Sequence, residues 1–164
     1  IITHYETAIG AYAILTAFFP MLMDTGGNAG GQTSVTIIRG LSLGEIRLRD
    51  VFRVLWKEFR VSLMCGGTLA AATFFKVFAV DFHFHATSML ESGILQNNLT
   101  ICAIVCLTVF FAIVIANIVG TLLPIGAKRL GFDPAVMASP FITTVVDAIS
   151  LMIYFNFASM ILPF

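Results

Sequence analysis

The chain has 164 residues, of which 59% are hydrophobic and 11% are charged, and its mean hydropathy is +0.97. Because a soluble domain carries about 25% charged residues, this composition excludes a water-soluble globular protein. It predicts an all-α protein that crosses the lipid bilayer several times. Nine basic and nine acidic residues give zero net charge, so nothing in the charge balance points to a nucleic-acid partner.

The first apolar stretch runs from about residue 5 to residue 23 and is followed by the glycine-rich run DTGGNAGG at 24–31. We expect the helix to break in this run and to expose backbone carbonyls, because each interior glycine costs a helix about 1 kcal/mol. A shorter apolar piece at 32–41 would complete one discontinuous element. The run lacks the Lys-Ser/Thr ending of a phosphate-binding loop.

Segment 45–60 places apolar residues at helical spacing among several arginines, which favours an amphipathic helix lying along the membrane surface. Residues 61–80 form a second apolar stretch, in which Gly66 and Gly67 would allow another helix to approach closely. The connection at 81–98 has no Lys or Arg. Its two histidines, His83 and His85, are interpreted as interfacial residues.

A third span is predicted over 99–127, with small residues at four-residue spacing that suit helix packing: Ala112, Ala116 and Gly120. Asn117 on this span could line a pore or hydrogen-bond to another helix, and Pro124 would free a backbone carbonyl nearby. Asp133 and Pro134 are predicted as the N-cap and first position of the last span. The three cysteines, Cys65, Cys102 and Cys106, are interpreted as small hydrophobic residues.

Basic residues gather between 39 and 60 and at 128–129, so the positive-inside rule places these connections in the cytoplasm. Four spans would then leave both chain ends outside. We therefore expect a further span before Ile1, giving five in a multi-pass protein of the plasma membrane.

Asp147 is the one acidic residue after Asp133. It would lie about 15 Å inside the membrane, at about 1.5 Å of rise per helical residue, and an acid at such depth is a functional-site hypothesis. Polar residues share its predicted helix face: Ser139, Thr143, Ser150 and Tyr154. The alternative interpretation is a packing stripe with a protonated Asp147.

A carboxylate with hydroxyl and carbonyl oxygens suits a hard cation such as Mg²⁺ or Ca²⁺. A two-fold dimer would bring two Asp147 side chains together around a mostly hydrated ion. Asp24 could be a second ligand or an interfacial residue that ends the helix. Glu58 could be a solvated or a surface-paired charge, or part of a cation site at the cytoplasmic mouth.

Three blocks occur in order: FPMLMDTGGNAGGQTS at 19–34 with IIRGL at 37–41, NIVGTLLP at 117–124 with GFDPA at 131–135, and PFITTVVD at 140–147. They resemble the motifs of the membrane domain of the MgtE family of bacterial magnesium channels and transporters. The resemblance implies a homodimer with five helices per protomer and a cation pathway on the two-fold axis. It also implies regulatory cytoplasmic domains, an N-terminal domain and paired CBS domains, in the full-length protein.

The resemblance implies that Mg²⁺ is bound by Asp147, the backbone carbonyl of Thr143 and Ser139, which stands where some members have Asn. We expect further pore-lining or supporting roles for a set of polar and small residues: Thr144, Ser150, Asn117, Gly120, Pro124, Asn28, Gly26 and Gly27. Residues 1–164 are then one permeation domain that conducts Mg²⁺ into the cell and is not an enzyme.

Three alternatives stay open. One is a Na⁺- or H⁺-coupled divalent-cation carrier or exporter. Another is an intramembrane hydrolase that uses Asp24 and Asp147 as an acid pair. The third is a membrane anchor, which would leave Asp147 without a role.

Overall fold

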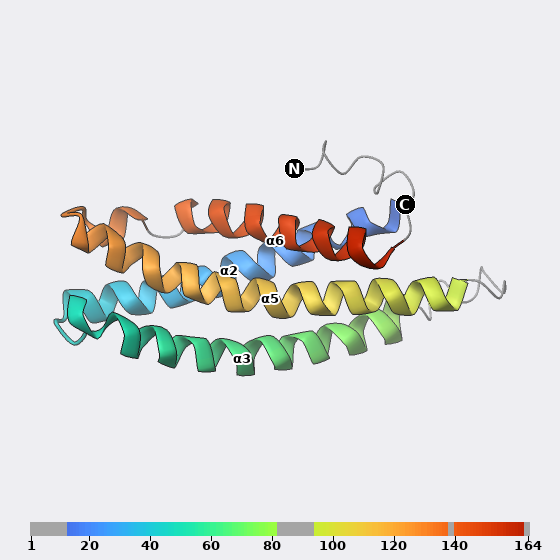
Figure 1. Cartoon of the computed structure of the whole chain (residues 1–164), viewed down its shortest axis with the longest axis horizontal. Coiled ribbons are helices and arrows are strands. Elements are labelled where there is room, and N and C mark those ends of the chain that lie inside the picture. The colour runs from blue at the N-terminus through green and yellow to red at the C-terminus, as the bar shows by residue number, and fades with distance from the viewer. Residues whose placement is uncertain (1–12, 82–93, 138–139, 163–164) are drawn as a thin grey trace.

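The computed structural model describes residues 13–81, 94–137 and 140–162. Four long helices dominate these residues: α2 (Phe19–Ser42), α3 (Val51–Lys76), α5 (Ile94–Arg129) and α6 (Pro140–Ile161). Short helical segments flank them: η2 (Ala13–Phe18), η3 (Leu48–Asp50), η4 (Val77–Asp81) and η5 (Pro134–Met137). The described chain holds no strand, and its helices run side by side along one long axis (Figure 1). The all-α prediction is confirmed.

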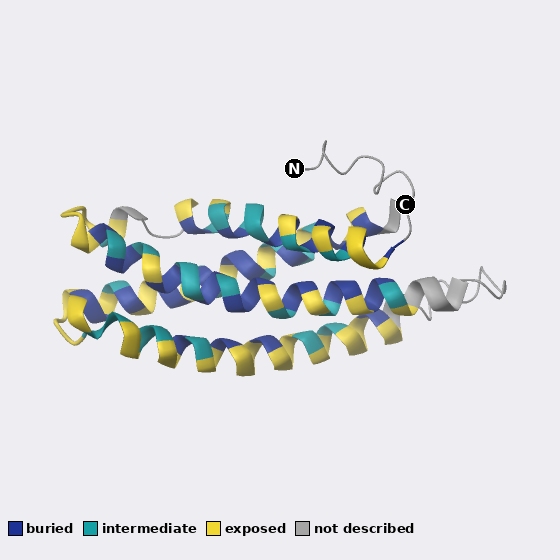
Figure 2. Ribbon diagram, viewed as in Figure 1, coloured by how far each residue is buried: buried dark blue, intermediate teal, exposed yellow. Residues whose placement is uncertain are grey.

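Helix α5 forms the centre of the bundle and packs against α2, α3 and α6 (Figure 1). Its buried residues, among them Ile104, Val105 and Ile113, form the main core with Leu22 and Tyr154 from the neighbouring helices. Helix α3 packs mainly on α5 and exposes most of its surface (Figure 2). In the apolar windows of the two helices, 56% of α5 but only 17% of α3 is buried, so α3 is peripheral.

Three segments of the described chain are long and apolar enough to cross a membrane: Leu48–Ala79, Leu99–Arg129 and Pro140–Ile161. These agree with three of the four predicted spans. Helix α2 has 24 residues, as many as a span needs, but its polar and glycine-rich sequence keeps it outside this apolar class. The fourth span, and the fifth before Ile1, stay predictions.

The predicted helix break at 24–31 is wrong, because α2 runs unbroken through it. Gly26, Gly27 and Gly30 are all buried there, at the contacts of α2 with α5 and α6. A Cβ at Gly30 would come within 3.1 Å of the Ala116 carbonyl oxygen. Close helix packing thus outweighs the low helix propensity of glycine, which is only a weak local preference.

The helical spacing predicted for 45–60 is confirmed, but the separate surface helix is wrong. Helix α3 begins at Val51 and continues without interruption into the apolar stretch. Val51 and Val54 pack against a cluster of Ile37, Leu41 and Ile125 at the end of the bundle. Val51 and Val54 are therefore covered by α2 and α5, whereas Phe52 and Trp56 of the same segment are exposed, at 85% and 60%.

The connection before the last helix also differs from the prediction. Gly131, with φ of 82°, ends α5 in the left-handed conformation that glycine adopts readily. Asp133 caps the helical segment that begins at Pro134, as expected, since its Oδ1 accepts a hydrogen bond from the Ala135 N–H at 2.9 Å. That cap begins only η5, however, and the last long helix begins at Pro140.

Several predicted features can be placed briefly. Gly66 lies against Phe110 of α5, as a helix-packing glycine should, whereas a Cβ at Gly67 would meet nothing within 4 Å. Cys65 is exposed, Cys106 is partly buried and Cys102 is fully buried. Ser139, His83 and His85 lie outside the described residues.

Candidate functional site

Asp147 lies on α6 at its contact with α2, and its side chain is partly exposed. A Cβ at Gly27 would come within 3.4 Å of Asp147 Oδ1 and 3.3 Å of Thr143 Cγ2. The glycine therefore lets the acidic side chain rest directly against the backbone of α2. Thr143 and Asp147 are one turn apart, so both face the same strip of the neighbouring helix.

Asp24 lies in the interior of α2, on the exposed side of the helix. Its Oδ1 accepts a hydrogen bond from Asn28 Nδ2 at 3.0 Å, one turn further along. Asp24 lies about one turn before Gly27, the glycine of α2 against which Asp147 rests, so the two acids occupy neighbouring parts of α2 and α6. The interpretation of Asp24 as an interfacial residue that ends the helix is wrong, because α2 continues to Ser42.

No hydrogen bond joins Asp24 to Asp147 among those of the described residues; the side-chain bond of Asp24 goes to Asn28. An acid pair that shares one proton needs direct contact between its carboxyl groups. The arrangement is instead an acidic strip along one lateral side of α2 and α6. Described His, Cys, Asp and Glu side chains form no group of three that could hold a metal ion.

The predicted polar stripe on α6 divides into two environments. Thr143 and Asp147 are partly exposed, while Ser150 and Tyr154 are buried at 1% and 0% exposure. The Ser150 hydroxyl lies against Gly26, and Tyr154 donates a hydrogen bond to the Leu15 carbonyl at 3.1 Å. Helix α2 runs obliquely to α6 (Figure 1). The face of α6 that carries these residues therefore meets α2 at Asp147 and Ser150, and η2 at Tyr154.

Asn117 links α5 to α2 through a hydrogen bond. Thr33 Oγ1 of α2 donates a hydrogen bond to Asn117 Oδ1 at 3.0 Å, and both side chains are buried. Thr121 Oγ1 donates to the Asn117 carbonyl. Of the two interpretations left open for Asn117, the structure therefore favours the interhelical hydrogen bond.

Gly120 and Pro124 lie on the same buried side of α5. A Cβ at Gly120 would collide with the backbone carbonyl of Gly30, so this glycine sets the closest approach of α2 and α5. Helix α5 continues past Pro124 to Arg129. Gly120 therefore shapes the crossing of α2 and α5, whereas Pro124 is a buried residue within a continuous helix.

Glu58 lies on α3 and is only 7% exposed, so it is not a solvated charge. Its carboxylate lies 3.6 Å from the Lys57 ammonium group. Helix α3 packs mainly on α5 rather than on α6. Glu58 therefore stands apart from the acidic strip on α2 and α6.

One element of the site was missed from the sequence. The exposed polar residues of α2 repeat every fourth position, as Asp24, Asn28, Gln32 and Thr36. This spacing marks one face of a continuous helix. The four-residue spacing is visible in the sequence, but it indicates a single helix face only if the helix continues through 24–31, where a break was expected.

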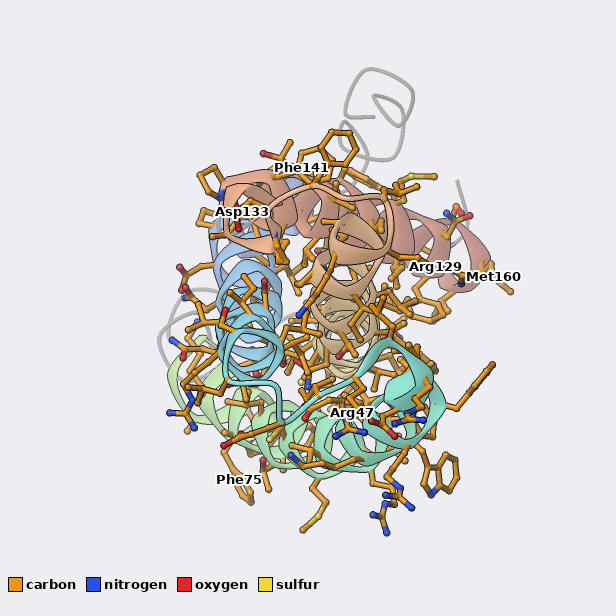
Figure 3. The ribbon with its side chains drawn as sticks, turned by 90° about the vertical axis from the view of Figure 1, so that its left-hand side faces the viewer. Arg47, Phe75, Arg129, Asp133, Phe141 and Met160 are labelled. Atoms are coloured by element: carbon orange, nitrogen blue, oxygen red, sulfur yellow. The ribbon has the colours of Figure 1, made fainter. Side chains whose placement is uncertain are left out.

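Thr144 is exposed next to Thr143, and both hydroxyls donate to the Pro140 carbonyl, at 2.8 and 3.1 Å. Both hydroxyls are therefore bonded to the backbone of the first turn of α6. Figure 3, which looks along the bundle, places the start of α6 next to α2 and opposite α3.

Comparison with known proteins gives consistent matches. Residues 19–157 match the sequence model of MgtE, described as a divalent cation transporter. The chain is 32% identical over its whole length to the magnesium transporter MgtE of Enterococcus faecalis, and 35% identical over 99% of its length to that of Thermus thermophilus. The corresponding protein of Bacillus subtilis is 31% identical over 97% of the chain.

The chain spans about a third of the length of these relatives, 32–33% in each case. The matched region includes all four long helices except the last residues of α6 in the family comparison. It thus contains the glycine crossing, the acidic strip and three apolar membrane-span candidates. The chain belongs to the MgtE family of divalent cation transporters and corresponds to its transmembrane domain.

Proposed function

We propose that two copies of this chain form a pathway through which Mg²⁺ enters the cell, with the acidic strips of α2 and α6 facing each other across a two-fold axis. The observation that carries the proposal is the exposure of Asp24 and the partial exposure of Asp147 on one side of a membrane bundle. The relatives are named as magnesium transporters, which supports Mg²⁺ as the transported ion.

The dimer follows from the cost of placing charge in lipid. An acidic residue at the centre of a membrane helix costs about 2.5–3.5 kcal/mol, and Asp24 and Asn28 would both face acyl chains in an isolated copy. A second copy across a two-fold axis would present the same polar surface and could enclose water between the two. The acidic strip would then line an aqueous path.

Mg²⁺ suits this path because the strip offers carboxylate, amide and hydroxyl oxygens and no soft ligand. Asp147 would hold the hydrated ion from both subunits, with the backbone carbonyl of Thr143 and the Ser139 oxygen beside it. Asp24, one helix away, would add negative charge that attracts the cation without binding it directly.

Passive entry is energetically sufficient. Moving a divalent ion across 100 mV yields about 4.6 kcal/mol, twice the value for one elementary charge. A coupled carrier or exporter is the second candidate, because Asp147 rests against α2 about one turn from Asp24, and neighbouring carboxylates repel each other when both are ionised. Either Mg²⁺ or a proton would relieve that repulsion.

The test is Mg²⁺ flux into liposomes that contain the reconstituted protein, under an imposed potential and no other gradient. We expect flux in the wild type and a loss of at least about tenfold, or ~1.4 kcal/mol, in Asp147→Asn and Asp147→Ala. The control is Glu45→Gln, which removes an exposed acid in the connection between α2 and η3.

Flux that needs an added Na⁺ or H⁺ gradient would replace the passive pathway with the coupled carrier. Flux of wild-type size in both Asp147 variants would remove this acid from the cation path and overturn the proposed site.

A further inference from the structure

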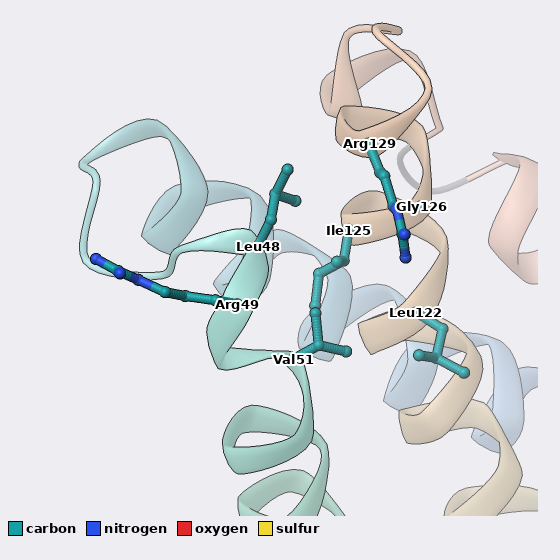
Figure 4. A pocket seen from close by; sticks show the side chains of 7 residues that line it. All are labelled: Leu48, Arg49, Val51, Leu122, Ile125, Gly126 and Arg129. Carbon is teal, nitrogen blue, oxygen red and sulfur yellow. The ribbon is translucent and has the colours of Figure 1, made fainter.

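A second feature lies away from the acidic strip, at the end of the bundle that the positive-inside rule predicts to be cytoplasmic. A cavity of about 440 Å³ opens between the start of α3 and the end of α5. We call it the arginine groove, and it is lined by Leu48, Arg49, Val51, Leu122, Ile125, Gly126 and Arg129 (Figure 4). Its walls are apolar except for the two arginines, a combination that suits an amphipathic ligand with a negative charge.

Neither arginine of the groove has an acidic partner among the residues that the structure describes. The ion pair of the described residues joins Lys57 to Glu58, and neither Arg49 nor Arg129 takes part in it. In Figure 4, Arg129 turns back along α5 towards Gly126, while Arg49 points outwards from the opposite side. A guanidinium group forms strong, paired hydrogen bonds with phosphate oxygens, so an anionic headgroup would satisfy Arg129 at the mouth of the groove.

The floor of the groove is open at Gly126. A Cβ built there would meet no atom within 4 Å, in contrast to the crowded glycines of the α2 crossing. Leu122 and Leu48 are both 42% exposed along the walls. An acyl chain lying over these side chains would remove apolar surface from water at the membrane interface.

The surrounding charge favours the same occupant. Apart from Lys76, the basic residues of the chain fall between Arg39 and Arg60 or at Lys128 and Arg129. These stretches meet where α2 ends, α3 begins and α5 ends (Figures 1 and 3). Anionic lipids give the cytoplasmic leaflet a negative surface potential, and basic pockets between membrane helices on that side bind their headgroups.

We propose that the arginine groove binds an anionic phospholipid, with its phosphate on Arg129, Arg49 at the rim, and an acyl chain along Leu122 and Ile125. The lipid would link η3 and the start of α3 to the end of α5. Binding at this place does not depend on the nature of the ion path, so the two proposals can fail separately.

The experiment is native mass spectrometry of the full-length protein in detergent, titrated in parallel with phosphatidylglycerol and phosphatidylcholine. We expect phosphatidylglycerol to bind more tightly, and Arg129→Ala to weaken it about tenfold, as loss of one charge-assisted contact predicts. Gly126→Leu should fill the groove and weaken binding similarly.

Matched controls separate the groove from general surface charge. Arg60→Ala removes an exposed basic residue of α3 outside the groove, and Gly67→Leu adds the same side chain at another open glycine. Both should bind phosphatidylglycerol like the wild type. Gel filtration of each variant reports whether the fold is retained.

Three results would overturn the proposal. One is equal binding of the two lipids, and another is an equal loss in Arg60→Ala and Arg129→Ala, which would indicate unspecific attraction. The third is full displacement of the lipid by inorganic phosphate at equal concentration, which would indicate a simple anion site that does not use the apolar walls.

Discussion

The apolar outer side of α3 around Met64 and the polar side of α2 around Asp24 are both exposed in a single copy, but their chemistry differs. On α3 the exposed side chains include Met64 at 74% and Phe75 at 69%. On α2 the exposed positions include Asp24 and Asn28. The first face suits acyl chains and the second does not. Exposure alone therefore does not tell what covers a membrane helix, whereas the cost of transfer into lipid does.

The largest loss of stability is expected when a negative charge is added to the apolar face, in contrast to the same charge on the polar face. Met64→Asp places a charge on the apolar face of α3 and should destabilise the inserted protein by about 3 kcal/mol. Gln32→Glu adds the same charge to the polar face of α2 and should have little effect. Membrane insertion assays and thermal unfolding in lipid would measure both. Equal losses would break the distinction between the faces.

Substitution of the crossing glycine should have the next largest effect. Gly120→Ala drives a Cβ into the Gly30 carbonyl, and such overpacking costs about 1–3 kcal/mol. Gly31→Ala on α2 meets nothing within 4 Å and should be neutral or slightly stabilising. Thermal unfolding in detergent compares the pair. A neutral Gly120→Ala would show that α2 and α5 are not held in this close approach.

The role of the second acid can be separated from that of the first. Asp24→Asn keeps the size of the side chain and should weaken the apparent Mg²⁺ affinity in flux about fivefold, or ~1 kcal/mol, by removing one nearby charge. Glu45→Gln is the control away from the strip. An unchanged affinity would reduce Asp24 to a hydrogen-bond partner of Asn28.

A smaller loss of stability is expected when a hydrogen bond inside the bundle is removed. Thr33→Val removes the hydrogen bond to Asn117 and should cost about 0.6 kcal/mol, the average for such bonds between membrane helices. Thr36→Val, which loses only a bond to the Gln32 carbonyl on an exposed surface, should cost less. Chemical unfolding in mixed micelles would rank them, and the reverse order would contradict the buried link.

Much of the fold could be predicted because apolar length and small-residue spacing are local signals. The third span was placed within a few residues of α5, and the buried ridge at Ala112, Ala116 and Gly120 followed from its spacing. The run at 24–31 could not be predicted in the same way. Its glycines have low helix propensity, and only the neighbouring α5 and α6 make the close contacts that stabilise them as helix.

The acidic strip, too, could be predicted only in part from local sequence patterns. Asp147 stood out from the sequence because it is isolated among apolar residues, and its place next to Thr143 follows from helical spacing. The proximity of Asp24 depends on how far α2 extends and where it crosses α6. That information lies in contacts between residues more than 100 positions apart, which a local pattern does not contain.

The most direct test asks whether the polar face lies in water and the α3 face in lipid. Asn28→Cys in a Cys65→Ala background would be compared with native Cys65, which is exposed on α3, using a charged, membrane-impermeant thiol reagent on protein in liposomes. We predict fast modification at position 28, slowed by Mg²⁺, and none at Cys65. A protected position 28 together with a reactive Cys65 would contradict the proposed aqueous path between two copies.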